Sequence, residues 1–90
     1  RLQKASYWQN AKPSKGYDRE LFTKLRSLRK EIADAEDIAP YIVFNDATLS
    51  ELARVKPKST SELLTINGIG DTKLLRYGQP FLQLIQQHLT

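Results

Sequence analysis

The sequence of 90 residues contains no cysteine and no methionine, and it has one histidine and one tryptophan. Without cysteine, disulfide bonds and thiolate metal sites are excluded. No apolar run approaches the roughly 20 residues that span a bilayer, and no signal-peptide pattern opens the chain. We therefore predict an intracellular protein with no membrane partner. The missing initial methionine indicates a fragment of a longer chain, and the length allows one compact domain, which we expect to be monomeric.

Acidic residues are absent from residues 1–17, which hold four basic residues, Arg1, Lys4, Lys12 and Lys15. These four account for the net charge of +4 of the whole chain, because the ten basic residues of 18–90 are balanced by ten acidic ones. Any nucleic-acid binding by residues 18–90 must therefore come from a local basic patch and not from bulk charge. With Pro13, Gly16 and little periodicity, residues 1–17 are predicted to be a linker or N-terminal extension, and residues 18–90 the folded domain.

Helical periodicity begins at Asp18. Apolar residues recur at steps of four, three and four, at Leu21, Leu25, Leu28 and Ile32. This spacing predicts one long amphipathic helix over about Arg19–Glu36, with Asp18 as its N-cap.

The next segments alternate between short apolar runs and capping residues. Residues 39–44 form an apolar run with no partner strand elsewhere, so we predict an extended or 3₁₀ crossing. Asn45 and Asp46 then cap a predicted helix over Ala47–Val55. A short helix is expected over Ser61–Thr65, preceded by a capping box between Ser59 and Glu62.

The last helix is predicted to start at Asp71, after a tight Asn-Gly-Ile-Gly hairpin, and to kink or restart at Gly78 and Pro80. If the two halves of this segment are counted as separate helices, the pattern predicts five helices and no sheet. The fold class is therefore predicted to be all-α, a compact five-helix bundle.

No group of residues has the spacing of a catalytic or metal site. His88, the only histidine, falls in the last helical turn and is expected to be solvated or to favour the helix C-terminus. It lacks a second histidine or a cysteine to complete a metal site. The acidic residues lie on a polar helix face, and no phosphate-binding Walker loop is present. We predict no catalytic residue, no metal and no cofactor in this domain.

The hairpin is the first of three candidate nucleic-acid contacts. Gly68 and Gly70 allow close backbone approach, the following helix start exposes N–H groups, and Lys73 could add a charge. The pattern is similar to the hairpin of helix-hairpin-helix DNA-binding proteins. The alternative is a tight turn that buries Ile69, and Asp71 places a negative charge where a phosphate would sit.

The second candidate is a basic patch, and the third is an aromatic side chain. Tyr41 follows a proline in the apolar crossing, where an exposed ring can stack on an unpaired base; the alternative is a half-buried tyrosine. Basic residues crowd the first helix and the end of the second, where they could contact phosphates: Lys24, Arg26, Arg29, Lys30, Arg54, Lys56 and Lys58.

With these motifs in order, residues 17–89 resemble the helicase-and-RNase-D C-terminal (HRDC) domain, in the version found in bacterial RecQ DNA helicases. The resemblance is carried by Tyr17-Asp18-Arg19-Glu20-Leu21-Phe22, Pro40-Tyr41-Ile42-Val43-Phe44, Asp46-Ala47-Thr48-Leu49 and Asn67-Gly68-Ile69-Gly70. It implies a five-helix accessory domain that holds single-stranded or partly duplex DNA for an ATP-dependent helicase motor elsewhere in the parent chain. It also implies that Tyr41 contacts DNA and that the protein acts in the bacterial cytoplasm, at the nucleoid.

The leading hypothesis is therefore a DNA-binding accessory domain in which Tyr41 stacks on a base. Its phosphate contacts are predicted at Lys24, Arg26, Lys30, Lys56 and Lys58, with Gly68, Gly70 and Lys73 as the hairpin site. A second hypothesis is a module that docks on the helicase core of the same chain or on a partner protein, through the apolar crossing and the aromatic pair Tyr7 and Trp8. A third is the corresponding domain of an RNase-D-type exonuclease.

Overall fold

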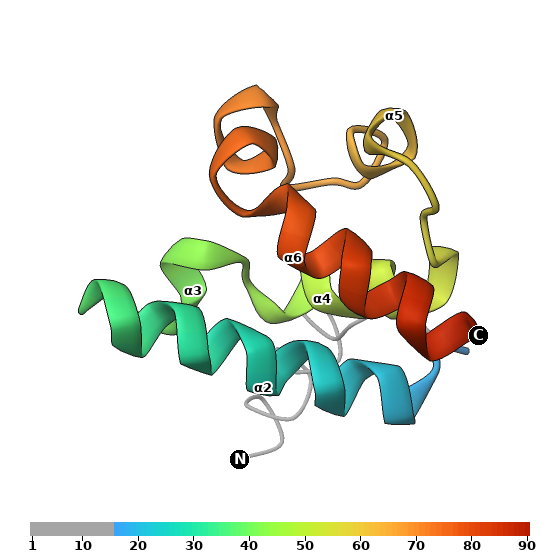
Figure 1. The fold of residues 1–90 in the computed structure, drawn as a ribbon, viewed down its shortest axis with the longest axis horizontal. Helices are drawn as coiled ribbons and strands as arrows, with labels where there is room; N and C mark the ends of the chain where they lie inside the picture. Colours follow the sequence, from blue (N-terminus) through green and yellow to red (C-terminus); the bar gives the residue numbers. More distant parts are fainter. Residues whose placement is uncertain (1–15) are drawn as a thin grey trace, which may run out of the picture.

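The computed structural model describes residues 16–90, which form five helices and contain no strand. In chain order these are α2 (Arg19–Glu36), α3 (Pro40–Val43), α4 (Asp46–Val55), α5 (Thr60–Leu63) and α6 (Asp71–Leu89), drawn in Figure 1. The all-α, five-helix prediction is confirmed, although the five segments differ from those expected. The predictions for residues 1–15, including the roles of Tyr7 and Trp8, lie outside the described residues.

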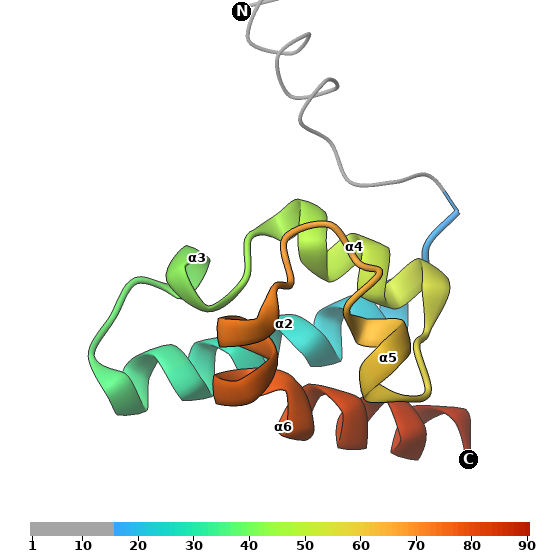
Figure 2. The ribbon, with the colours of Figure 1, turned by 90° about the horizontal axis from the view of Figure 1, so that it is seen from above.

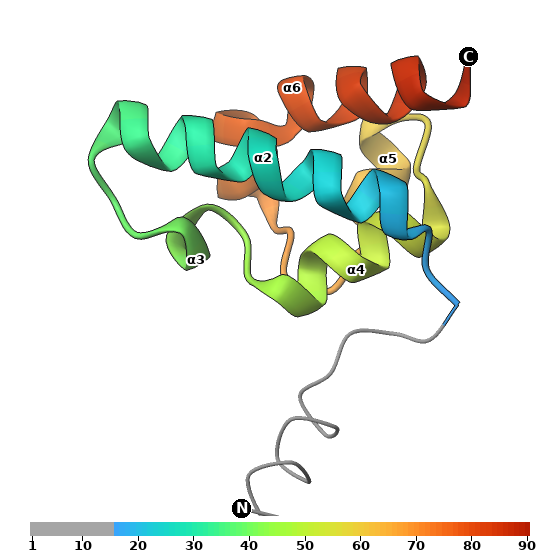
Figure 3. The same ribbon diagram turned by 90° about the horizontal axis from the view of Figure 1, so that it is seen from below.

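Helix α2 has the predicted bounds, because both its cap and its buried stripe are local signals. The Asp18 carboxylate accepts a hydrogen bond from the Leu21 backbone N–H at 3.0 Å. At the other end Asp37 adopts the left-handed conformation, with φ of 55°, and its N–H closes the last turn. Viewed from above and below, α2 runs between α4 and the second half of α6 (Figures 2 and 3). Helix α2 thus packs against α3, α4 and α6, while α5 packs against α6.

The apolar crossing is a helical turn and not an extended segment, so the prediction for residues 39–44 was wrong in its conformation. Pro40 starts α3, where its fixed φ suits a first helical turn and its missing N–H costs nothing. Val43 and Phe44 are fully buried, whereas Tyr41 and Ile42 are exposed. The second half of this apolar run therefore lies in the core, and Tyr41 and Ile42 lie on the surface.

Helices α4 and α5 follow their predicted caps, with small shifts at their ends. Asn45 accepts from the Thr48 N–H at 2.8 Å, so α4 begins at Asp46, one residue before the expected start. Helix α5 is a single turn, shorter than the predicted Ser61–Thr65. Ser59 caps it as expected, but the Glu62 carboxylate accepts from the N–H of Lys58 and not from that of Ser59.

Helix α6 is continuous over Asp71–Leu89, with Pro80 inside it, so it does not restart. Pro80 cannot donate to the preceding turn, and the helix bends between its orange and red halves in Figure 1. Gly78 leaves room for the Leu74 side chain of the same helix, since a Cβ there would lie 2.8 Å from Leu74 Cδ1, whereas Leu63 Cδ1 of α5 would lie at an ordinary contact distance of 3.6 Å. Within residues 16–90 no helix has the length and apolar character needed to cross a bilayer.

Aromatic side chains join the two halves of the chain in the core. Phe44 and Phe81 are fully buried and meet edge to face, with ring centroids 4.9 Å apart. Tyr77 also meets Phe44 edge to face, with ring centroids 6.1 Å apart. The segment between α3 and α4 is thereby fixed against α6.

Candidate nucleic-acid interface

A groove of about 330 Å³ lies between α2 and the start of α3. Side chains that donate hydrogen bonds line most of it, and the carboxylate of Asp34 and the ring of Pro40 complete it. The lining residues are Thr23, Arg26, Ser27, Arg29, Lys30, Asp34 and Pro40. The sequence pattern had missed the two hydroxyl residues of this set, because neither belongs to a motif. Such a lining suits a phosphate group, which accepts hydrogen bonds and carries negative charge.

Tyr41 follows the groove residue Pro40 on α3, and 69% of its surface is exposed. The alternative of a half-buried tyrosine is therefore wrong. A ring exposed to this extent can offer a face to an unpaired base without moving any core side chain. The structure thus brings together the aromatic candidate and part of the basic patch.

Two of the predicted cations, Arg26 and Lys30, belong to this groove. Both are exposed, and Arg26 has no ion-pair partner among residues 16–90. Lys30 Nζ lies 3.0 Å from Asp34 Oδ2, an exposed contact one helical turn apart. Such surface pairs contribute little, so a phosphate can compete for this ammonium group at small cost.

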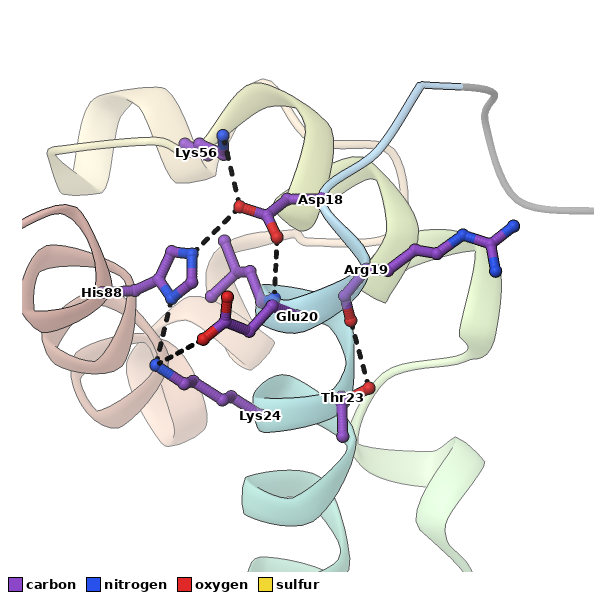
Figure 4. Close-up of polar contacts among 8 residues, drawn as sticks. Asp18, Arg19, Glu20, Thr23, Lys24, Lys56 and His88 are labelled. Carbon is purple, nitrogen blue, oxygen red and sulfur yellow. Dashed lines mark hydrogen bonds and ion pairs between the residues drawn. The ribbon is translucent and has the colours of Figure 1, made fainter.

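Lys24 and Lys56 lie elsewhere, around the N-cap of α2 (Figure 4). Lys24 Nζ contacts His88 Nδ1 at 3.1 Å, and Lys56 Nζ lies 3.5 Å from Asp18 Oδ2. Residues two positions apart on a helix point in nearly opposite directions, so Lys24 faces α6 while Arg26 faces the groove. The predicted basic patch is therefore two separate groups of cations.

His88 lies in the last turn of α6 as predicted, but it is not solvated. Its side chain is only 12% exposed, and its Nε2 lies 2.9 Å from Asp18 Oδ2, a partner 70 positions away in the chain. Because the Lys24 ammonium can only donate, Nδ1 is the acceptor and Nε2–H donates to Asp18. The contact joins the last turn of α6 to the first turn of α2 (Figure 4).

The Asp18 carboxylate has its pKa lowered from 3.8 to about 2 by the Leu21 backbone N–H and then by His88. A lowered pKa in the folded state gives stability that is complete above pH 3.8 and is lost as the pH falls toward 2.

We expect the stability of Asp18→Asn to depend less on pH in this range, because asparagine is also a good N-cap but cannot ionise. Urea unfolding of both proteins between these pH values should show a stability difference that shrinks on acidification; a constant difference would contradict the assignment.

Arg29 also departs from the prediction, because it is a buried anchor and not part of an exposed basic patch. Its side chain is 11% exposed. Nη1 donates to the Phe44 carbonyl at 2.9 Å and lies 2.8 Å from Asp46 Oδ1. Arg29 lies one helical turn after the buried Leu25 and so on the buried face of α2, but its partners could not be read from the sequence.

Of the two other predicted cations near α4, one forms an ion pair and the other is exposed. Arg54 pairs with Glu51 at 2.7 Å one turn away. Lys58 is exposed, with its backbone carbonyl accepting from the Gln86 side chain in α6. Lys58 thus lies near the second group of cations, away from Tyr41.

The hairpin has the features of a tight turn that buries Ile69, which is 5% exposed. Gly68 has φ of +100°, and the Thr48 hydroxyl donates to the neighbouring Asn67 carbonyl at 3.0 Å. Gly70 is the N-cap of α6 and makes no side-chain cap. Lys73 lies over the Phe44 ring, 5.9 Å from its centroid, which places this ammonium beside the α3–α4 connection. Phosphate binding by the hairpin stays a prediction.

Among residues 16–90 no three side chains of histidine, aspartate or glutamate are grouped closely enough to hold a metal ion.

Comparison with known proteins places the chain in one family. The family model of the HRDC domain matches residues 18–85. The chain is 62% identical over 72 residues to the ATP-dependent DNA helicase RecQ of Haemophilus influenzae, covering 80% of this chain and 12% of that protein. It is 46% identical over 69 residues to RecQ of Bacillus subtilis, covering 77% and 12%. The chain thus spans about an eighth of these relatives.

A solved structure agrees with the sequence matches. The D. radiodurans RecQ HRDC domain 3 superposes with a TM-score of 0.74 at 33% identity, covering 77% of this chain and 91% of that one. With the matched family model and these relatives, the chain belongs to the HRDC domain family.

Proposed function

We propose that this domain binds single-stranded or partly duplex DNA on behalf of a RecQ-type ATP-dependent DNA helicase in the same parent chain. The motor supplies ATP hydrolysis, and this domain supplies a substrate contact and needs no cofactor of its own. The relatives named as RecQ helicases support a DNA-processing parent in preference to an RNase-D-type exonuclease. Such a parent would act in the bacterial cytoplasm, at the nucleoid.

The observation that carries the proposal is the exposed Tyr41 ring next to a groove lined by Arg26 and Lys30. A base stacked on Tyr41 leaves the adjoining phosphates free to enter the groove, where the charges of Arg26 and Lys30 and the hydroxyl of Ser27 meet them. A continuous duplex keeps its base faces stacked on each other. The arrangement therefore favours unpaired nucleotides, at a single-stranded region or at the end of a duplex.

Replacing Tyr41 by alanine is expected to weaken binding to a fluorescein-labelled oligothymidylate about fivefold or more, because stacking is worth roughly 1–3 kcal/mol per base. Fluorescence anisotropy at low salt measures the change. Circular dichroism should remain that of the wild type, since the ring is 69% exposed and supports no core contact.

Tyr41→Phe is the matched control, because it keeps the ring and removes only the hydroxyl; its affinity should stay within about twofold of the wild type. An alanine variant that binds as well as the wild type would remove Tyr41 from the interface. NMR shifts confined to residues 68–73 on titration with the same oligonucleotide would move the contact to the hairpin.

A docking module is the second candidate, and the exposed apolar side chains favour it. Ile42 on α3 is 43% exposed, and Leu75 on α6 is 87% exposed. Either could meet the helicase core of the parent chain. This alternative expects negligible affinity for DNA and a measurable complex with the separate motor domains.

A further inference from the structure

We infer that Arg29 is a positioning residue, which fixes α3 against α2 and so sets Tyr41 at a defined place beside the groove cations. The inference rests on the proposed DNA binding. It adds a residue that touches no nucleotide and whose contacts determine where the stacking ring lies.

Helix α3 cannot hold its own position. It is a single turn of four residues with no side-chain cap, and isolated helices of this length are unstable. Tyr41 and Ile42 face outward, so they do not anchor it. The place of the Tyr41 ring therefore depends on what holds the residues that follow, beginning with Val43 and Phe44 in the core.

Arg29 supplies the polar part of this anchor from α2. One nitrogen, Nη1, reaches the Phe44 carbonyl at 2.9 Å and the Asp46 carboxylate at 2.8 Å. Phe44 follows the last residue of α3, and Asp46 is the first residue of α4. The guanidinium thus ties the whole α3–α4 connection to one point on α2.

The same side chain lies among the groove residues. Arg29 follows Arg26 by three positions and directly precedes Lys30, and all three line the groove. A change at Arg29 therefore alters the distance between the cations on α2 and the ring on α3. Because the pair is open to solvent at Asp46, whose side chain is 59% exposed, the charge attraction adds little stability, and an arginine at this position is better explained by geometry than by stability.

A double-mutant cycle tests this role in the 90-residue protein, with Arg29→Met, Tyr41→Ala and the two combined. Arg29→Met keeps an unbranched side chain that can fill the stem of the buried position, although it is shorter than arginine, and Asp46, whose side chain is 59% exposed, can be hydrated when its partner is lost. We expect Arg29→Met to weaken oligothymidylate binding about threefold, and Tyr41→Ala to cost less than about twofold in that background, against about fivefold in the wild type. Equal effects of Tyr41→Ala in both backgrounds would overturn the inference.

The salt dependence separates positioning from direct contact. If Arg29 bound a phosphate itself, Arg29→Met would lower the slope of log affinity against log salt by about one, and that result would also overturn the inference. An unchanged slope is expected. If Tyr41→Ala alone does not change DNA affinity, the proposed function is wrong, and the inference, which depends on it, is wrong as well.

Asp46→Ala gives the same test from the other side of the contact, and it serves if Arg29→Met does not fold. Removing a negative charge should strengthen DNA binding through charge alone, whereas loss of the anchor should weaken it by about twofold. Asp71→Ala is the matched control, since Asp71 is likewise exposed and first in its helix. Weaker binding for Asp46→Ala but not for Asp71→Ala supports the positioning role; stronger binding for both overturns it.

Discussion

Phe44→Ala is expected to destabilise the domain by about 3–5 kcal/mol, because a fully buried aromatic ring is removed and the cavity cannot close. The ring meets Phe81 at 4.9 Å and Tyr77 at 6.1 Å, so its loss loosens the contact between the α3–α4 connection and α6. The melting temperature should fall by about 15 °C or more. Urea and thermal unfolding followed by circular dichroism measure both quantities.

Leu75→Ala is the control for this substitution, since it also removes a large apolar side chain but from a position 87% exposed. Its stability should stay within about 0.5 kcal/mol of the wild type. Phe44→Leu should fall between the two and keeps the protein measurable if the alanine variant is unfolded. A loss below about 1 kcal/mol for Phe44→Ala would show that this ring does not join the two halves of the core.

Gly68→Ala is the second substitution with a large expected effect, about 1–3 kcal/mol of lost stability. Its φ of +100° is a conformation that a residue with a Cβ adopts at a cost. The added Cβ would also collide with the Thr48 hydroxyl, which holds the Asn67 carbonyl. Chemical unfolding should therefore show a lower midpoint with an unchanged denaturant slope.

Gly70→Ala is the matched control in the same hairpin. Its φ is −107°, and a Cβ there would meet nothing within 4 Å, so only the weaker capping by alanine at this N-cap should be felt. The variant Thr48→Ala/Gly68→Ala should recover part of the loss, since the collision is removed while the backbone strain stays. Equal losses at both glycines would contradict the account.

The sequence was sufficient to predict those elements whose ends depend on residues close together in the chain. The bounds of α2 followed from the spacing of its leucines and from Asp18 as a cap, and Asn45 and Ser59 capped α4 and α5 as expected. Each of these depends on residues within one or two helical turns. The exposure of Tyr41 was one of two alternatives that the sequence left open; in the structure Val43 and Phe44 fill the core, and Tyr41 and Ile42 lie outside it.

The errors arose where distant segments decide the structure. The sequence of residues 39–44 does not show whether the crossing is extended or helical. Its conformation depends on the burial of Val43 and Phe44 against α2 and α6, which are distant in the chain. Arg29 and His88 carry charge or polarity that suggested exposure, yet their partners lie 15 to 17 and 70 positions away. Periodicity shows which face a residue occupies, but it does not show what packs against that face.

The contact between His88 and Asp18 closes the described chain on itself, since one residue lies two positions after Gly16 and the other two positions before Thr90. Tension applied between these two ends acts on that contact first and tends to separate the start of α2 from the end of α6. The α3 turn lies toward the opposite end of α2 (Figure 1), outside this line of force. The first contact exposed to such tension therefore lies at the other end of α2 from the surface around Tyr41.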